Sequence, residues 1–299
     1  MNNRIVMLEQ PQLTDPYIIV GLNGWLNAGE VSTGIIDYLR RKINARKFAY
    51  IDAQGFYIYQ IPSSNPELTL RPRVQISEGL VKNLDFKENN IYFWKSESDH
   101  DLIILQGVEP NLNWPEYCQV ILDLAHQFHA PRIYCPGAFF DQVPHTRETR
   151  IFVTVSHQRL KSEFDPFAHF GNYIGPGSFT TMLLDLGYKQ GIEVVGMMAR
   201  APIYIHDLNT KACHDLLKNI LDMTRLQIDL NDLRQASEKL VEMLDRSFSE
   251  NPTALEQLKK MEELYDSVLG KEPLQGLGED YDKLLEEMHK LKRDGRKPH

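Results

Sequence analysis

The stretch YIIVGLNGWLNAGE, residues 17–30, holds the transition on which a fold prediction depends. Residues 17–22 are apolar throughout and rich in β-branched side chains, as is typical of a buried strand. From residue 28 to 41 apolar side chains recur at helical spacing. Asn27 followed by Glu30 has the form of a capping box, which predicts that a helix starts here. A strand running directly into a helix indicates an α/β fold.

Similar patterns extend along the chain. Apolar, β-branched runs predict strands over residues 48–51, 91–94, 102–105, 132–135, 151–155 and 192–199. Amphipathic segments predict helices over 115–129 and 179–189. Three prolines interrupt residues 55–90, where the alternating piece 73–77 indicates antiparallel edge strands or a flap.

The last third of the chain reads as helical. We expect helices over residues 210–228, 231–248, 253–269 and 279–293, separated by Asn-Pro and by a Pro- and Gly-containing segment. Strands that alternate with helices and then give way to a helical tail predict a three-layer α/β/α sandwich with a C-terminal helical extension. We expect an α/β core domain over residues 1–228 and a helical region over 229–299.

Composition excludes several classes of protein. The formal net charge of −8 argues against nucleic-acid binding, which requires a basic face. Charged residues are scattered among the first twenty, and no apolar run approaches the roughly 20 residues of a spanning helix. The three cysteines are odd in number and widely spaced, with neither a disulfide framework nor a zinc spacing. We expect a cytoplasmic protein that contacts no membrane and no nucleic acid.

The segment YIGPGS, residues 173–178, raises the question of phosphate binding. No lysine follows Gly177, so the segment is not a Walker A loop. Pro176 removes an amide donor, and a threonine stands where a dinucleotide fingerprint requires a third small residue. We therefore expect no nucleotide cofactor. Instead, Gly175 and Gly177 would form a close-packed turn beside residues 23–30, and Ser178 would cap the next helix.

Residues 23–30, NGWLNAGE, lie where α/β folds place ligands, between a strand and a helix. Two interpretations remain open: a capped, tightly packed turn, or a binding site. The polar or conformationally special positions in this turn are Asn23, Gly24, Asn27, Gly29 and Glu30.

The loop PHTRET carries a second polar group. His145 and Arg147 could bind an anion or act in acid–base chemistry, or they could belong to an ion-paired surface loop. His126 and His129 share a helix face without the HExxH pattern, so we predict no metal site.

Three motifs in order resemble the proteasome assembly chaperone family, in its bacterial and archaeal branch: GWLNAG at 24–29, VPHTR at 143–147, and YIGPGS followed by GIEVVGMMARAPIYI up to residue 205. The resemblance spans roughly residues 5–250. It implies a phosphorylase/hydrolase-like α/β/α core, formation of a homo-oligomer and no established reaction. Relatives in eukaryotes and archaea help to assemble the proteasome core particle, and some members carry a label as ATP-dependent carboxylate–amine ligases.

The chain departs from the family pattern at two places. It has Asn27-Ala28-Gly29 where many relatives have Asp-Ala-Gly, so a role for that carboxylate is lost. It ends in Lys297-Pro298-His299, whereas many assembly chaperones end in hydrophobic–Tyr–any residue and dock on the proteasome through that tail. The resemblance therefore does not imply that this chain docks in the same way.

Two classes of function follow. The first is a non-catalytic, chaperone-like protein-interaction protein that forms a trimer or tetramer and engages another protein complex. The second is a small-molecule enzyme of nucleoside phosphorylase or hydrolase type, in which His145 and Arg147 would serve the turns at residues 23–30 and 175–178. A carboxylate–amine ligase is a third, less favoured alternative, since no nucleotide loop or metal-binding carboxylate group supports it.

Overall fold

The computed structural model describes residues 4–60, 70–86, 88–97, 100–165 and 168–269. Its elements, in chain order, are β1 (Ile5–Met7), β2 (Tyr17–Asn23), η1 (Ala28–Glu30), α1 (Val31–Lys42), β3 (Arg46–Ile51), β4 (Arg73–Ser77), β5 (Leu80–Asp85), β6 (Asn89–Trp94), β7 (Leu102–Val108), α2 (Trp114–Gln127), β8 (Arg132–Asp141), β9 (Ile151–Val155), η2 (Gln158–Leu160), α3 (Lys161–Phe164), β10 (Ala168–His169), α4 (Phe179–Gln190), β11 (Glu193–Pro202), α5 (Thr210–Thr224), α6 (Asn231–Ser249) and α7 (Pro252–Leu269).

The described residues contain a nine-stranded mixed sheet in the order β1-β3-β6-β7-β2-β8-β11-β9-β10. Its centre, β7-β2-β8-β11, is parallel, and antiparallel pairs flank that centre. The parallel strands therefore end along one side of the sheet, which we call the carboxyl edge. Every strand predicted from apolar runs is present in this sheet, so the mixed α/β fold is confirmed.

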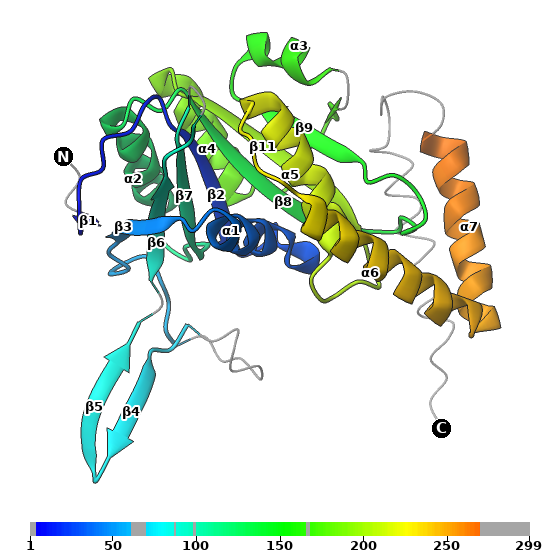
Figure 1. Cartoon of the computed structure of the whole chain (residues 1–299), viewed down its shortest axis with the longest axis horizontal. Coiled ribbons are helices and arrows are strands. Elements are labelled where there is room, and N and C mark those ends of the chain that lie inside the picture. The colour runs from blue at the N-terminus through cyan, green and yellow to red at the C-terminus, as the bar shows by residue number, and fades with distance from the viewer. Residues whose placement is uncertain (1–3, 61–69, 87, 98–99, 166–167, 270–299) are drawn as a thin grey trace.

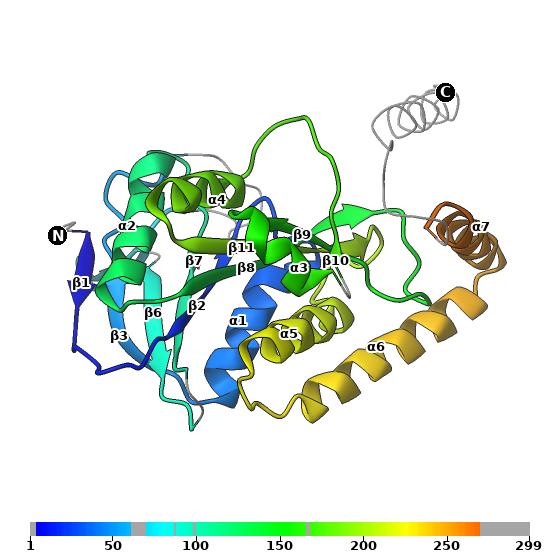
Figure 2. The same ribbon diagram turned by 90° about the horizontal axis from the view of Figure 1, so that it is seen from above.

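Helices cover both faces of the sheet (Figure 2). α2 and α4 bury their apolar sides on one face with Val20, Phe48 and Ile133. α1 and α5 bury theirs on the other face with Ile19 and Tyr134. Because β2 is covered on both sides, its run of apolar residues suits a central parallel strand.

Close packing between β2 and α1 requires a glycine at position 21. A Cβ atom there would lie 2.1 Å from Cγ1 of Ile36 and 2.7 Å from the carbonyl oxygen of Ser32. Real side chains do not approach so closely, so the strand and the helix can meet at this distance only without a side chain at residue 21.

The start of α1 differs from the prediction. α1 begins at Val31, because Gly29 and Glu30 have left-handed φ values of 56° and 51° and hold a separate 3₁₀ turn before it. The capping-box prediction is therefore wrong. Oδ1 of Asn27 accepts a hydrogen bond from the amide of Thr33 at 3.0 Å, rather than from the amide of Glu30.

The predicted packed turn at residues 175–177 is also wrong. Gly171 to Gly177 are exposed, and neither Gly175 nor Gly177 has a positive φ. A Cβ on Gly177 would meet only the hydroxyl of Thr181, at 3.1 Å. The prediction for Ser178 is confirmed, because it is buried and its Oγ accepts a hydrogen bond from the amide of Thr181 at the start of α4.

Two segments extend from this body. β4 and β5 form a separate antiparallel hairpin that points away from the sheet (Figure 1), where the sequence indicated edge strands or a flap. α6 packs against α5 and leads into α7, which lies beyond the β9 side of the sheet (Figure 2). α5 ends at Thr224, four residues before the predicted end, because Arg225 is left-handed. The predicted helix at 279–293 lies outside the described residues.

Candidate functional site

The predicted site residues separate into two places. The first is the carboxyl edge at β2, where residues 23–30 lie against the start of α4. A cavity of about 30 Å³ is lined there by Leu26, Ser32, Glu109 and Ser178, among others. The two turns are thus neighbours, but the cavity has room for only one or two water molecules.

Residues 23–30 bind one another and the elements around them. Glu109 lies against Gly24 and accepts a hydrogen bond from the amide of Trp25 at 2.6 Å. Asn23 accepts a hydrogen bond from the side chain of Asn27, and the carbonyl of Gly29 accepts one from the amide of Asn209. These contacts are those of a packed turn. Sequence analysis missed Glu109, which follows β7 as an ordinary loop carboxylate.

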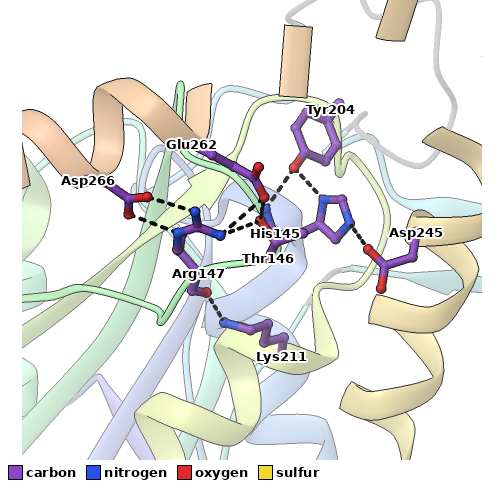
Figure 3. A network of polar contacts seen from close by, with 8 residues as sticks. All are labelled: His145, Thr146, Arg147, Tyr204, Lys211, Asp245, Glu262 and Asp266. Carbon is purple, nitrogen blue, oxygen red and sulfur yellow. Dashed lines mark hydrogen bonds and ion pairs between the residues drawn. The ribbon is translucent and has the colours of Figure 1, made fainter. Parts of the chain in front are cut away.

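The second place is the loop between β8 and β9, which contains His145 and Arg147 (Figure 3). His145 is only 2% exposed. Its Nδ1 lies 2.7 Å from the hydroxyl of Tyr204, and its Nε2 lies 3.2 Å from Oδ1 of Asp245 in α6. The same hydroxyl also accepts a hydrogen bond from the amide of His145, at 2.8 Å.

One protonation pattern satisfies all of these contacts. Tyr204 donates its proton to Nδ1, and the protonated Nε2 of His145 donates to Asp245. Burial lowers the pKa of His145, and the hydrogen bond to Asp245 opposes this only in part, so the imidazole is neutral at neutral pH. Burial also raises the pKa of Tyr204 to about 12. Both ring nitrogens of His145 are occupied, and neither is exposed to a substrate.

Arg147 binds α7. Its guanidinium donates two hydrogen bonds to the carboxylate of Asp266, at 2.9 and 2.7 Å, and a third to Glu262 at 3.2 Å. The hydrogen bonds from Arg147 lower the pKa of Asp266. Such a fork-to-carboxylate pair fixes orientation as well as charge.

Other contacts complete the attachment of α7 to this loop. Thr146 donates a hydrogen bond to Glu262, and the hydroxyl of Tyr265 donates to the carbonyl oxygen of Glu148 at 2.8 Å. Nζ of Lys211 in α5 donates a hydrogen bond to the carbonyl oxygen of Arg147 at 2.8 Å. Burial lowers the pKa of this lysine. α7 is therefore held on the loop by polar groups, and its Leu258 is buried as well.

The enzyme alternative would place His145 and Arg147 at the two turns, but His145 binds Tyr204 and α6, and Arg147 binds α7. The interpretation as an ion-paired loop describes Arg147 correctly. Sequence analysis missed Tyr204, Asp245, Glu262 and Asp266. The three acidic residues carry no signal that distinguishes them from solvent-facing charges of amphipathic helices.

Among the described residues, no cluster of three or more His, Cys, Asp or Glu side chains is arranged to hold a metal ion. The helices of the described part are also too short or too polar to cross a lipid bilayer.

A model of the PAC2 family matches residues 21–247, which include all three motifs of the resemblance. The chain belongs to the PAC2 family. The resemblance to the proteasome assembly chaperone family, in its bacterial and archaeal branch, is thereby confirmed. A search of curated proteins gave no match.

Solved structures share the fold of this PAC2 family protein. A Corynebacterium glutamicum protein of unknown function is 24% identical, with a TM-score of 0.75 over 90% of this chain and 99% of its own. A Mycobacterium tuberculosis proteasome-assembly chaperone homologue is 23% identical, with a TM-score of 0.70 over 81% of this chain and 99% of its own. A Pyrococcus furiosus archaeal proteasome activator is 22% identical, with a TM-score of 0.61 over 81% of this chain and 97% of its own.

Proposed function

We propose that this PAC2 family protein is a non-catalytic, homo-oligomeric interaction protein that assists another protein complex, in the manner of proteasome assembly chaperones. The proposal includes a cytoplasmic location, no cofactor, and a core of the three-layer phosphorylase/hydrolase-like type. It also treats residues 1–228 as the α/β core and 229–299 as a helical region.

The observation that carries the proposal is family membership over residues 21–247. Among proteins with the same fold, one is described as a proteasome-assembly chaperone homologue and another as a proteasome activator. Fold alone does not assign a function, so the role in assembly has to be tested directly.

The geometry around His145 favours an interaction protein over an enzyme of the phosphorylase or hydrolase type. A general acid–base histidine needs a ring nitrogen within reach of the substrate. Here one nitrogen binds Tyr204 and the other binds Asp245, inside the protein. Arg147, which would bind an anionic substrate, is engaged by two carboxylates of α7.

The enzyme alternative has one observation in its favour. The cavity at the end of β2 lies between the starts of α1 and α4, where open α/β sheets bind ligands. At about 30 Å³ it would have to open considerably to admit a nucleoside. The carboxylate–amine ligase alternative has no comparable support.

The test is an assembly reaction. Purified α and β subunits of a proteasome core particle are mixed with and without the chain, and assembled particles are followed by native electrophoresis. We expect faster or more complete assembly, without added nucleotide. In parallel, nucleosides with phosphate, and nucleotides with amines, are assayed for turnover. Turnover that His145→Ala abolishes in a folded protein, without any effect on assembly, would overturn the proposal in favour of the enzyme.

A further inference from the structure

A small cavity lies between the loop that follows β8 and the helices α6 and α7. Its volume is about 20 Å³, which is room for about one water molecule. Residues of the loop and of the end of β11 line it, together with Lys211 of α5, Leu240 and Leu244 of α6, and Tyr265 of α7. The cavity therefore lies where four elements distant in sequence meet.

Arg200, near the end of β11, contributes an unused donor to this lining. Its Nε donates a hydrogen bond to Oδ2 of Asp141 at 2.6 Å, and its side chain is only 13% exposed. Its Nη1 is buried and has no hydrogen-bond partner among the described residues. A buried N–H group without an acceptor keeps its full desolvation cost. This nitrogen therefore calls for an acceptor that the described protein atoms do not supply.

Thr149, in the loop, contributes a second donor. Its hydroxyl oxygen accepts a hydrogen bond from Nζ of Lys211 at 3.0 Å. A hydroxyl that accepts a hydrogen bond still has its own proton to donate, and the described part of the chain offers no acceptor for it. Arg200 and Thr149 therefore both bring an unused donor to the same cavity.

The acceptors of the loop are already in use. The carbonyl oxygens of residues 147, 148 and 150 accept hydrogen bonds from the side chains of Lys211 and Tyr265 and from the amide of Arg200, respectively. Among the described residues that line the cavity, the one acidic residue is Glu148, which is exposed. A water molecule would satisfy both donors but would have few acceptors for its own two protons. A ligand that only accepts hydrogen bonds fits this lining better.

The charges of the lining also favour an anion. Four cationic residues line the cavity in a chain whose formal net charge is −8: Arg147, Arg150, Arg200 and Lys211. Three of them pair with carboxylates outside the lining, which are those of Asp266, Asp141 and Asp215. These pairs offset part of the charge, but none of the three carboxylates lines the cavity.

The positive potential of this region also acts on a neighbouring histidine. The pKa of His169 in β10 is lowered, first by burial and then by the charges of Arg150 and Arg200. The guanidinium of Arg150 also lies over the ring of Tyr265, at 5.2 Å from its centre. An anion between β11 and α7 would therefore be attracted by more than one cation.

The size of the cavity selects the ligand. Space for about one water molecule excludes phosphate or a nucleotide unless α6 or α7 moves. Chloride is monatomic and only accepts hydrogen bonds. We propose that this cavity binds one chloride ion, which accepts hydrogen bonds from Nη1 of Arg200 and from the hydroxyl of Thr149. The ion ties β11 to the loop on which α7 rests. This inference goes beyond the proposed function and does not depend on it.

Bromide is the probe for the position of the ion, because it has the same charge and scatters X-rays anomalously. Crystals of the full chain are soaked in sodium bromide. We expect an anomalous peak in the cavity, within hydrogen-bonding distance of Nη1 of Arg200. A cavity that holds a water molecule and no bromide would overturn the proposal.

Thermal unfolding tests whether the ion matters to the protein. The melting temperature is compared in sodium chloride and in sodium gluconate at equal ionic strength, which keeps screening the same while the gluconate ion is too large for the cavity. An ion that binds only the folded state raises its melting temperature, and we expect a value about 2 °C higher in chloride. Arg200→Gln and Thr149→Val should each abolish this difference.

Two matched variants should keep the difference. In Arg4→Gln the lost guanidinium also paired through Nε with a carboxylate, that of Glu116 at 2.8 Å, but it does not line the cavity. Thr149→Ser retains the hydroxyl. Circular dichroism checks every fold, and Thr149→Val decides the test if Arg200→Gln misfolds. Equal melting temperatures in the two salts despite a bromide peak would mean an adventitious ion only. A chloride effect that survives in Thr149→Val and in a folded Arg200→Gln would place the ion elsewhere, and either result overturns the proposal.

Discussion

The β4–β5 hairpin and helix α7 both extend from the sheet, but they differ in what holds them. The hairpin presents apolar side chains to solvent and has no partner strand among the described residues. α7 lies on its own body through ion pairs and hydrogen bonds to the loop after β8. A large exposed apolar face marks an interaction site, whereas exposed ion pairs contribute little net stability in water. Oligomer assembly is therefore expected to depend on the hairpin, and internal rearrangement on α7.

The largest effect is expected from removing the hairpin. Replacing residues 73–85 by a short Gly-Ser linker should weaken self-association by at least about 100-fold, since this corresponds to only about 3 kcal/mol of lost apolar burial. Sedimentation over a concentration series measures it. Because the hairpin makes little contact with the sheet, the melting temperature of the body should stay within a few degrees. A large fall would show that the hairpin also stabilises its own body.

The next effect concerns α7. Arg147→Ala removes the hydrogen bonds to Asp266 and Glu262, and it should loosen α7 without detaching it, because Tyr265 still binds the carbonyl oxygen of Glu148. Hydrogen exchange of residues 252–269 measures the loosening. Lys259→Ala removes the same charge from an exposed position of α7 and is the control. Equal exchange in the two variants would show that Arg147 does not hold the helix.

Salt should affect the hairpin and α7 differently. At 1 M NaCl the screening length falls to about 3 Å, which weakens exposed ion pairs but not apolar contacts. We expect faster exchange in α7 and an unchanged oligomer mass. An oligomer that dissociates in salt would show that charged rather than apolar contacts hold the copies together.

Acid should act on the His145 contact. The native pKa of His145 is lowered, so the unfolded chain takes up a proton more readily than the folded chain as the pH falls below 6.5. This contribution to stability is therefore present above pH 6.5 and is lost toward the lower native pKa. Denaturant unfolding of the wild type and of His145→Gln between pH 5 and 8 measures the difference, which should shrink as the pH falls. A constant difference would contradict the neutral, buried imidazole.

The smallest effect is expected at Gly177. It is exposed and has no positive φ, so Gly177→Val should change the free energy of unfolding by no more than about 0.5 kcal/mol. Gly21→Val is the contrasting variant, because its side chain would overlap Ile36, and it should cost about 3 kcal/mol or more. Similar costs for the two would show that residues 171–177 pack more closely than their exposure indicates.

Local sequence patterns were sufficient for most elements of the fold. The apolar run at β2, the spacing in α4 and the cap at Ser178 each reflect interactions within a few residues. The start of α1 was placed three residues early because the left-handed turn at Gly29 and Glu30 has no periodic signature.

The polar network could not be predicted in the same way. His145 and Asp245 are 100 residues apart, and only the packing of α6 brings them together. Glycines in residues 171–177 suggested close packing, but glycine also occurs in exposed segments. Only the tertiary structure distinguishes a packed glycine from an exposed one.

The bulge in the hairpin has a consequence for solubility. The register shifts beside Gln75, so Lys82 is the one residue of β5 between Val81 and Asn83 without a partner in β4. An interrupted ladder with a lysine in it is a poor template for further strands. Deleting Lys82 would keep every existing pair, and with it the exposed apolar side chains, while making the ladder regular and leaving Asp85 as the one charge of β5. The exposed apolar strand would then be better suited to edge-to-edge aggregation, so Lys82 is expected to help keep the hairpin soluble.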